Sequence, residues 1–572
     1  MTSVAGHITN NDFPKEFGWN NCSPVALFDA PTKIKVENPL IADNITQEAQ
    51  NCDALMIWTD CDREGEYIGW EVVEQAKKRN PRITLESTYR ARFSHLERSH
   101  ILQAARNPIR LDLKAIDAVK TRMEVDLRTG ACLTRFLTNL FKGVLGGEKS
   151  SMISYGGCQF PTLGFVVDRY KRIKLFVKEP FWLISLTFKK KQKQCPVTWE
   201  RGHLFDRLIT TCIYQNCLRM EDSEMATILS VATKPTSNWA PLPLTTVEMQ
   251  KDCGRFFKLT AKDTLAAAET LYTRGFISYP RTETDTFPKA MDLKGLVGKQ
   301  MESAKWGSYA KSLVDDGRFR QPRQGKHSDE AHPPIHPIIF VGDSANLTGV
   351  QKTVYEYVVR RFLACCSPDA KGFRTTIRLQ WGTEFFRTSG LVVKENGYLE
   401  VFIYSKWKSS KNNLPEVEPG ERVKVQKAVI SSGMTEPPKK LTETELIALM
   451  DANGIGTDAT IAEHIEKIKA RNYVTTLKVS EGRSKRQVIV PTELGYGLVE
   501  GFNRVGFNNI SLTKPFLRRS LEEELKRICE GQATRQNVLV KSITMYKEAF
   551  ALMSQQKRLL LDSYRETIAA NS

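Results

Sequence analysis

The chain has 572 residues, of which 41% are hydrophobic, and carries a formal net charge of +18. This length corresponds to about three or four domain-sized units, and the hydrophobic fraction excludes wholesale disorder. No apolar run approaches the roughly 20 residues of a membrane span. The first residues lack the basic flank and apolar stretch of a signal peptide, so a soluble protein inside a cell is expected.

The excess of Lys and Arg over Asp and Glu, 83 against 65, favours an anionic polymer as the partner. Each phosphate that a basic side chain neutralises releases condensed counterions, and this release drives binding to nucleic acids. A basic protein with no nucleic-acid partner is the alternative, because net charge informs on partners and not on fold.

The twelve cysteines are scattered along the chain, and no C-x-x-C pair occurs. A structural zinc site needs thiolates at short spacing, so no zinc is expected. The cysteines are therefore interpreted as the reduced, mostly buried thiols of an intracellular protein.

Strand and helix patterns alternate from an expected first strand at residues 2–8 to about residue 110, which is typical of an α/β sheet. The pattern from about 111 to 178 is mainly helical. Strands dominate from about 180 to 240. A helix is predicted at residues 261–273, closed by Gly275 and followed by a strand at residues 276–279.

Residues 303–332 are rich in Gly, Lys, Arg and Ser and are predicted to form an exposed loop. A second β-rich stretch runs from about 372 to 430. After Pro437–Pro438 the chain returns to helices, ending in a helical tail at residues 536–568. Because helical segments lie both before and after the two β-rich stretches, we expect a chain that leaves a domain and later re-enters it.

The strongest motif is a short apolar run, residues 54–58 (ALMIW), followed by acids at alternate positions. The run reads as a buried strand, and an amphipathic helix follows it. Ligands bind at the carboxyl ends of strands in α/β sheets, and alternate residues of an extended chain point the same way. Asp60, Asp62 and Glu64 are therefore expected to converge on one hard cation, and Mg²⁺ in a phosphate-chemistry site fits this donor set.

Two other interpretations compete for these acids. One acid could simply cap the following helix, although a cap needs only one. Asp60, Asp62, Gly65 and Glu71 also fall on the spacing of an EF-hand calcium loop. An EF-hand requires a long amphipathic helix before the loop, and the apolar run is too short for that.

A tyrosine ends the strand expected at residues 276–279. Pro280 keeps Tyr279 extended, so Arg281 can lie on the same side as the phenol. A guanidinium favours the phenolate and can hold a phosphate in a bidentate grip, and Glu283 is placed to orient Arg281. Taken alone, Tyr279 could equally be a core residue with a satisfied hydroxyl.

Two histidines follow in the segment HPPIHP. His332 and His336 would suit zinc only if they shared a helix face, and Pro333–Pro334 disfavour a helix. A rigid extended segment that presents His332 to a phosphodiester is the functional interpretation. Two solvent-exposed loop histidines are the alternative.

These motifs occur in the order found in type IA DNA topoisomerases of the topoisomerase III branch, which the chain resembles. TDCDREGE (59–66) resembles the Toprim acid motif, SYPRTETDTFP (278–288) the active-site motif and AHPPIHP (331–337) the histidine segment. SYGGCQFPTL (154–163) resembles the S-x-G-x-x-Q segment that lines the DNA groove. PLPLTTVEMQ (241–250) and GIGTDATIAEHI (454–465) also match in order. Together these matches cover nearly the whole chain.

The resemblance implies a multidomain α/β and α+β chain with a toroidal fold and an N-terminally incomplete Toprim domain. The domains expected from it are a Toprim domain without its first strand at 1–112, a discontinuous helical DNA-binding domain at 113–178 and 436–572, a discontinuous β-rich arch at 179–244 and 372–435, and an active-site tyrosine domain at 245–371. The family's first strand carries a catalytic Glu followed by Lys, and this sequence begins downstream of it. We therefore expect a shortened chain whose first domain folds less securely and which cleaves DNA poorly; a covalent adduct formed as by a full enzyme would contradict this.

Residue roles also follow from the resemblance. Tyr279 would attack a phosphodiester of single-stranded DNA and form a 5′-phosphotyrosine link, with Arg281 and His332 binding the phosphate and Glu283 beside them. Asp60 and Asp62 would hold Mg²⁺, supported by Glu64. The residues expected to contact DNA are Ser154, Tyr155, Gly156, Gly157, Cys158 and Gln159 of one segment, and Thr457 and Asp458 of a helix–turn–helix segment that one of the two would cap.

The function implied is Mg²⁺-dependent, ATP-independent cutting, strand passage and rejoining that relaxes negative supercoils and unlinks intermediates of DNA recombination and repair. A RecQ-family helicase and an OB-fold accessory protein are the implied partners, in the nucleus. Gly157 stands where bacterial relatives carry Arg, which favours the eukaryotic subgroup. A Toprim nuclease or primase, which needs no tyrosine, and a catalytically impaired DNA-binding fragment remain the alternatives.

Overall fold

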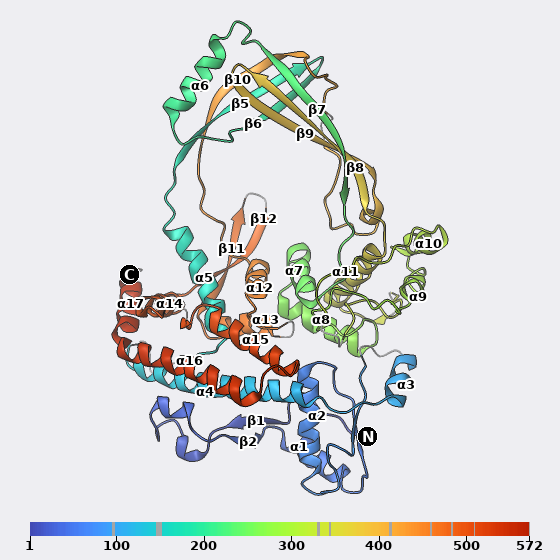
Figure 1. The fold of residues 1–572 in the computed structure, drawn as a ribbon, viewed down its shortest axis with the longest axis vertical. Helices are drawn as coiled ribbons and strands as arrows, with labels where there is room; N and C mark the ends of the chain where they lie inside the picture. The colour runs from blue at the N-terminus through green and yellow to red at the C-terminus, as the bar shows by residue number, and fades with distance from the viewer. Residues whose placement is uncertain are drawn as a thin grey trace.

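A computed structural model describes the chain from residue 1 to 570, except for residues 94–97, 145–151, 329–331, 343–344, 411–413, 458–459, 482–483 and 508–509. An arch made mainly of strands rises over a base of helices and small sheets, and two separate struts join the two (Figure 1). The N-terminal segment lies at the bottom of the base, beneath helices from both the first third and the end of the chain. This is the toroidal shape expected from the sequence.

The N-terminal part is an α/β unit with two small sheets. Strand β1 pairs antiparallel with β2, and β3 pairs parallel with β4. Its core packs α1 and α2 around Ile8, Val73 and Ile83. The elements are β1 (Thr9–Asp12), β2 (Lys33–Val36), α1 (Pro39–Glu48), β3 (Leu55–Ile57), α2 (Arg63–Ala76), β4 (Thr88–Arg90) and α3 (Arg98–Arg106).

The strand expected at residues 2–8 is not formed, and the first strand begins at Thr9. The buried carboxylate of Glu71 in α2 takes the backbone N–H groups of Ile8 and Thr9, at 3.1 and 3.0 Å. These N–H groups are therefore satisfied by a side chain and not by a neighbouring strand.

The helical part holds the largest core and is assembled from two segments of the chain. Helix α4, capped by Asp112, runs alongside α15 and α16 from the other end of the sequence (Figure 1). A hairpin of β11 and β12 interrupts the helices expected after Pro437–Pro438, and the tail divides into two helices at Gln556. The elements are α4 (Leu113–Leu140), α5 (Gln159–Lys174), α12 (Glu443–Ala452), α13 (Ile461–Ala470), β11 (Val474–Glu481), β12 (Ser484–Pro491), α14 (Glu493–Val505), α15 (Phe516–Cys529), α16 (Arg535–Gln555) and α17 (Lys557–Ala569).

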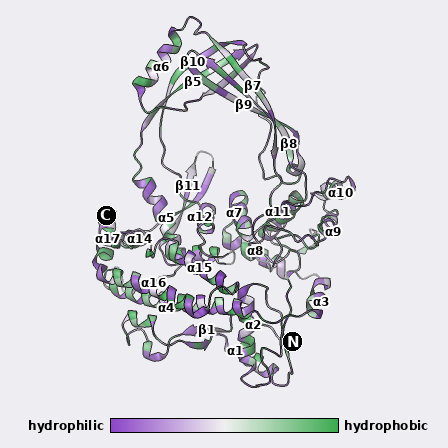
Figure 2. Ribbon diagram, viewed as in Figure 1, coloured by the Kyte–Doolittle hydropathy of each residue, from purple (hydrophilic) through white to green (hydrophobic). Residues whose placement is uncertain are grey.

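The arch is a closed antiparallel barrel with the strand order β10-β5-β6-β9-β8-β7. Hydrophobic and hydrophilic residues alternate along its strands (Figure 2), as expected for strands with one face inside. Trp199 and Trp381 fill its core. Helix α6, which begins after its N-cap Asp206, was not predicted from the sequence, where strands were expected from about 180 to 240. The elements are β5 (Pro180–Lys190), β6 (Lys193–Trp199), α6 (Arg207–Arg219), β7 (Met225–Asn238), β8 (Ala370–Trp381), β9 (Glu384–Glu395) and β10 (Arg422–Met434).

The fourth part lies at the foot of the second strut and carries Tyr279. The predicted helix at 261–273 is confirmed as α8, with Thr260 as its N-cap and Gly275 in the left-handed region after its end. Residues 303–332 are not simply a loop, because they contain α10, packed through the buried Trp306, Ala310 and Leu313. The elements are α7 (Thr246–Phe257), α8 (Ala261–Thr273), α9 (Leu293–Gly298), α10 (Gly307–Asp315) and α11 (Gly349–Cys365).

The strand expected at residues 276–279 is reduced to a single bridge between Ile277 and Pro337. Its two hydrogen bonds run from Ser278 N to His336 O, 2.9 Å, and from Ile338 N to Phe276 O, 3.0 Å. Pro280 has no N–H to donate on one side, and on the other side the N–H of Phe276 donates to the Leu271 carbonyl at the end of α8, so the ladder does not extend in either direction.

All twelve cysteines are free thiols. Of the helices in the described part of the chain, none is long and apolar enough to cross a membrane.

Candidate active site

The loop between β3 and α2 carries the first two acids. Asp62 is the N-cap of α2, and its side chain accepts the N–H of Gly65 at 2.7 Å. The carbonyl of Asp60 accepts a hydrogen bond from the buried Arg90, whose Nε also bonds Glu66 at 2.8 Å. A Cβ on Gly65 would lie 1.9 Å from the Asp60 carbonyl oxygen. Glycine at this position therefore allows the loop to fold back on the helix, where Arg90 holds the Asp60 carbonyl.

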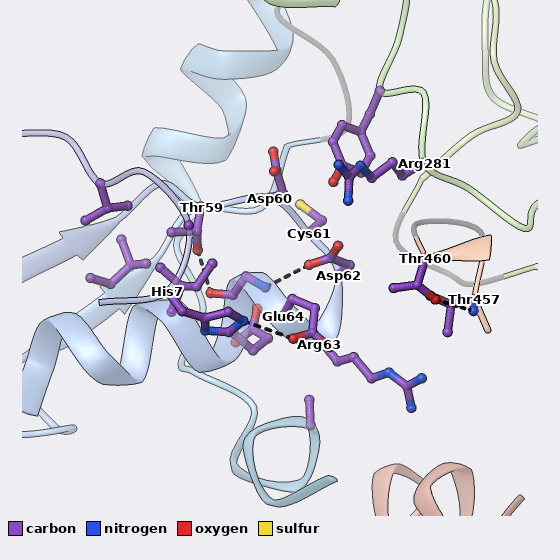
Figure 3. Close-up of a pocket in the computed structure, with 18 of the residues that line it drawn as sticks. His7, Thr59, Asp60, Cys61, Asp62, Arg63, Glu64, Arg281, Thr457 and Thr460 are labelled. Atoms are coloured by element: carbon purple, nitrogen blue, oxygen red, sulfur yellow. Dashed lines mark hydrogen bonds and ion pairs between the residues drawn. The ribbon is translucent and has the colours of Figure 1, made fainter. Parts of the chain in front are cut away.

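The expected convergence of three carboxylates is not observed. The chain becomes helical at Arg63, so the alternation of an extended strand ends at Asp62 and Glu64 projects from the first helical turn. Glu64 Oε2 is held by Arg122 at 2.8 Å and by His7 at 3.2 Å (Figure 3). No group of three His, Cys, Asp or Glu side chains within the described ranges is arranged to hold a metal ion. The cap interpretation is correct for Asp62, and an EF-hand is excluded because α2 occupies most of its loop.

The electrostatics of the acids reflect these partners. Burial and the neighbouring charge of Asp62 raise the pKa of Asp60, and the positive charges of His332 and Arg281 and a hydrogen bond with Tyr279 oppose that rise. Burial disfavours the charged form of His7, but its bonds to Glu64 and Glu71 raise its pKa to about 9. The pKa of Glu64 is lowered, because His7 and Arg122 outweigh its burial. The carboxylates of Asp60 and Asp62 repel each other in a cavity, and such a pair is a suitable site for a cation.

Tyr279 faces these acids across the boundary between two parts of the chain. The residue is 6% exposed, yet it lines a cavity of about 2370 Å³ together with Asp60, Asp62, Arg281 and His332. The ring centroid lies 4.5 Å from that of His332 and 5.2 Å from that of Tyr272. The interpretation of Tyr279 as an ordinary core residue is thus not supported, because Tyr279 lines the same cavity as Asp60 and affects the pKa of that carboxyl.

The histidine segment supports the tyrosine segment from behind. The ring of His336 is fully buried against Phe287 and Phe362, and the backbone N–H of His336 donates to Ser278 Oγ at 3.1 Å. His332 is 5% exposed and lines the cavity. Neither histidine lies in solvent: His336 packs in the core, and His332 lines the cavity.

Arg281 reaches from the tyrosine side toward the loop that carries Asp60 and Asp62 (Figure 3). Its Nε lies 2.9 Å from Glu269 Oε1, and its Nη2 bonds the same oxygen. Glu269 of α8 therefore orients the Nε edge of Arg281, which the sequence did not indicate, and the orienting role of Glu283 stays a prediction. Glu283 lines the cavity.

The two segments expected to contact DNA form another wall of the cavity. Tyr155, Gly156, Gly157, Cys158 and Gln159 line it, just before and at the start of α5. Ser154 does not line it, and its carbonyl accepts the hydroxyl of Tyr473 at 2.9 Å.

The helix–turn–helix segment consists of α12 and α13. Thr457 lines the cavity, and its N–H donates to Thr460 Oγ1 at 2.9 Å (Figure 3). The N-cap of α13 is Thr460 and not Thr457. Asp458 lies outside the described residues.

Several charged residues line the cavity although the sequence motifs did not include them as site residues. Arg518 is buried between Asp126, 2.9 Å away, and Glu522, 2.7 Å away, and Arg63 bonds Glu522 from α2 at 2.9 Å. Burial disfavours the charged form of Glu522, but the charges of Arg518 and Arg63 outweigh burial and lower the pKa of Glu522 to about 2. Only the i, i+4 spacing of Arg518 and Glu522 is visible in the sequence; the other contacts join distant segments.

Comparison with known proteins places these features in a family. The family model described as "DNA topoisomerase" matches residues 110–540, and the Toprim domain model matches residues 1–96. The chain is 51% identical over 576 residues to DNA topoisomerase 3 of Candidozyma auris, covering 99% of this chain and 88% of that protein. It is 50% identical over 599 residues to DNA topoisomerase 3 of Saccharomyces cerevisiae, covering 99% and 90%.

A solved structure shares the fold. Full-length topoisomerase I from Thermotoga maritima superposes with a TM-score of 0.72 at 21% identity, over 96% of this chain and 85% of that one. Both DNA topoisomerases 3 compared above come from eukaryotes, which agrees with the eukaryotic subgroup that Gly157 favoured.

Proposed function

Because this chain belongs to the type IA DNA topoisomerases, in the DNA topoisomerase 3 group, we propose that Tyr279 is the residue through which it cuts a DNA strand. One observation carries the proposal. Tyr279 and Asp60 line the same large cavity, close enough for Tyr279 to affect the pKa of Asp60, although the two residues belong to different parts of the fold. A nucleophile and a carboxylate brought together in this way can act on one phosphodiester.

The proposed reaction is a reversible transfer of a phosphodiester. The phenol oxygen of Tyr279 attacks phosphorus, a bond from phosphorus to that oxygen forms, and the bond to the 3′ oxygen breaks. The phenol gives up one proton to the solvent and the leaving 3′ oxygen takes up one proton from it, so the charges balance, while Asp60 lies beside the phenol. Arg281 and His332 hold the phosphate beside the phenol. One ester bond replaces another, so resealing needs no ATP.

Toprim domains typically bind Mg²⁺, and the oxygen donors here suit that ion. Asp60 and Asp62 are the residues proposed to hold it, with Glu64, fixed by His7 and Arg122, in a supporting role. Mg²⁺ prefers one or two carboxylates together with water and phosphate oxygens, so a pair of acids is sufficient. When bound, the ion would neutralise charge on the phosphate.

Single-stranded DNA is the proposed substrate within the cavity. The segment 155–159, Thr457 and the basic side chains of Arg122, Lys467 and Arg518 line the wall beyond the acids. Relaxation of negative supercoils, unlinking of recombination intermediates, a RecQ-family helicase, an OB-fold accessory protein and a nuclear setting complete the proposal. Their support is the likeness to eukaryotic topoisomerases 3.

The test is the formation of a covalent adduct. Excess protein is incubated with a 3′-end-labelled single-stranded oligonucleotide and Mg²⁺, denatured, and separated on a denaturing gel. We expect a labelled protein band that disappears with Tyr279→Phe or with removal of Mg²⁺ by a chelator. Tyr309→Phe is the matched control, because Tyr309 loses the same atom from a hydrogen bond to Ser367, 2.9 Å, within the core of the same part.

Strand breakage that persists in Tyr279→Phe would refute the role of this tyrosine and would indicate a Toprim nuclease. Binding of the oligonucleotide with no adduct from the unaltered protein would instead indicate a DNA-binding fragment.

A further inference from the structure

Arg281 is held by a side chain that the sequence motifs do not include. Glu269 lies on α8, three residues before Tyr272 and on the same face of the helix, and both side chains line the cavity. Tyr272 packs against Tyr279 and lines the cavity beside Asp60, whose charge adds to burial in raising the pKa of Tyr272. One face of α8 thus contacts the arginine, the tyrosine and the acid of the proposed reaction.

The geometry of the ion pair leaves part of the guanidinium available. Arginine has five N–H donors, and Nε and Nη2 both donate to the single oxygen Oε1 of Glu269. No other hydrogen bond of Arg281 is present among the residues that the structure describes. The edge formed by Nη1 and the second Nη2 hydrogen is therefore open, and a planar fork of this kind matches two oxygens of a phosphate.

The pair is placed where it contributes little to stability. The side chains of Arg281 and Glu269 are 30% and 38% exposed, and ion pairs open to solvent are weak. Glu269 also brings a negative charge into a cavity meant for a polyanion, which opposes DNA binding. Neither folding stability nor DNA affinity therefore explains the presence of an acid at this position.

Resting on the function proposed above, we propose that Glu269 is a positioning residue for that reaction. It fixes the Nε edge of Arg281, so that the Nη1 edge faces the phosphate beside Tyr279. A displaced guanidinium would still attract DNA but would no longer align the phosphate, and misplacement of about 1 Å can cost about 100-fold in rate.

The experiment separates binding from cleavage. Single-turnover adduct formation is measured at saturating single-stranded oligonucleotide, and DNA affinity is measured in a Tyr279→Phe background, which cannot cleave. The variants are Glu269→Ala, Glu269→Gln, Arg281→Ala and the double variant Glu269→Ala with Arg281→Ala. Glu463→Ala is the matched control: Glu463 also lines the cavity and acts electrostatically on Arg281, but pairs with Lys467 at 3.6 Å.

We expect Glu269→Ala to slow adduct formation at least tenfold while DNA binds as tightly as before or tighter. Glu269→Gln keeps an oxygen acceptor and should stay within about threefold of the parent rate. The double variant should be no slower than Arg281→Ala, since the effect of Glu269 passes through Arg281. Glu463→Ala should leave the rate unchanged. Alanine favours helix, so α8 should persist in each variant, which circular dichroism checks.

Three results would overturn the positioning role. A faster reaction of Glu269→Ala would show that Glu269 competes with the phosphate for Arg281. An unchanged rate, or additive losses in the double variant, would show that the two residues act independently. If the parent forms no adduct, or if Tyr279→Phe still forms it, the proposed function fails first and the role of Glu269 fails with it.

Discussion

Substitution of Gly65 by alanine tests whether the acid loop must fold back on α2. A Cβ at this position would lie 1.9 Å from the carbonyl oxygen of Asp60, and the two atoms must move apart by about 1.5 Å to reach the 3.4 Å of an ordinary contact. The obstacle is backbone and not the end of a flexible side chain, so it cannot be relieved by a rotamer change. The same carbonyl is held by Arg90, and this bond is lost if the loop moves.

The expected cost has a structural and a catalytic part. Overpacking of this kind destabilises by about 1–3 kcal/mol. Displacement of Asp60 by more than 1 Å should lower the rate of adduct formation by about 100-fold. DNA affinity should change little, because the other wall of the cavity, formed by segment 155–159 and Thr457, is untouched.

The assay compares adduct formation, DNA binding and thermal unfolding of Gly65→Ala with those of Gly130→Ala. Gly130 lies inside α4, and its nearest foreign atom, the carbonyl oxygen of Tyr155, would be 3.8 Å from a Cβ. Alanine there should stabilise by about 1 kcal/mol and keep the rate. A Gly65→Ala protein that forms adduct and unfolds like the parent would refute the argument that this loop positions Asp60.

Three further outcomes follow from the charged wall of the cavity and its support. Arg518→Ala leaves Asp126 and Glu522 without their buried partner, and we expect a loss of about 3–5 kcal/mol in denaturant unfolding; an unchanged midpoint would contradict this. Burial and nearby cations lower the pKa of His464 from 6.5 to about 3. The folded chain therefore keeps His464 neutral, whereas the unfolded chain binds a proton on this side chain below about pH 6.5. The free energy of unfolding is therefore highest above pH 6.5 and falls as the pH drops below it. This amounts to about 1.4 kcal/mol between pH 7.5 and 5.5, and a His464→Gln protein should lack this part of the pH dependence. Tyr473→Phe removes the hydrogen bond to the Ser154 carbonyl, which should cost about 1 kcal/mol and weaken DNA binding, as measured by fluorescence anisotropy.

Local patterns in the sequence determined much of the secondary structure near the site. The limits of α8 follow from Thr260, a capping residue, and from Gly275, which ends the helix in the left-handed region. The acid motif was placed at the end of β3 because an apolar run preceded it. These inferences succeeded because caps, glycine turns and apolar periodicity act between residues close in the chain.

Where local rules competed, the sequence was misleading. The alternation of Asp60, Asp62 and Glu64 predicted one ligand set, but the cap at Asp62 starts a helix and turns Glu64 to His7 and Arg122. The expected strand at residues 276–279 was limited to one bridge by Pro280 on one side and by the bond from Phe276 N to the Leu271 carbonyl on the other. The strand expected at 2–8 was replaced by bonds to Glu71, whose partners lie more than sixty positions away in the sequence.

The sequence by itself determined which chemical groups the chain carries and which local element presents each of them. Only the tertiary structure decided which groups meet: Tyr279 with Asp60, Arg281 with Glu269, and Arg518 with Asp126. The physical reason is range. Capping and periodicity are settled by neighbours within a few residues, whereas a contact across the cavity depends on how separate cores pack, and packing is a property of the whole chain.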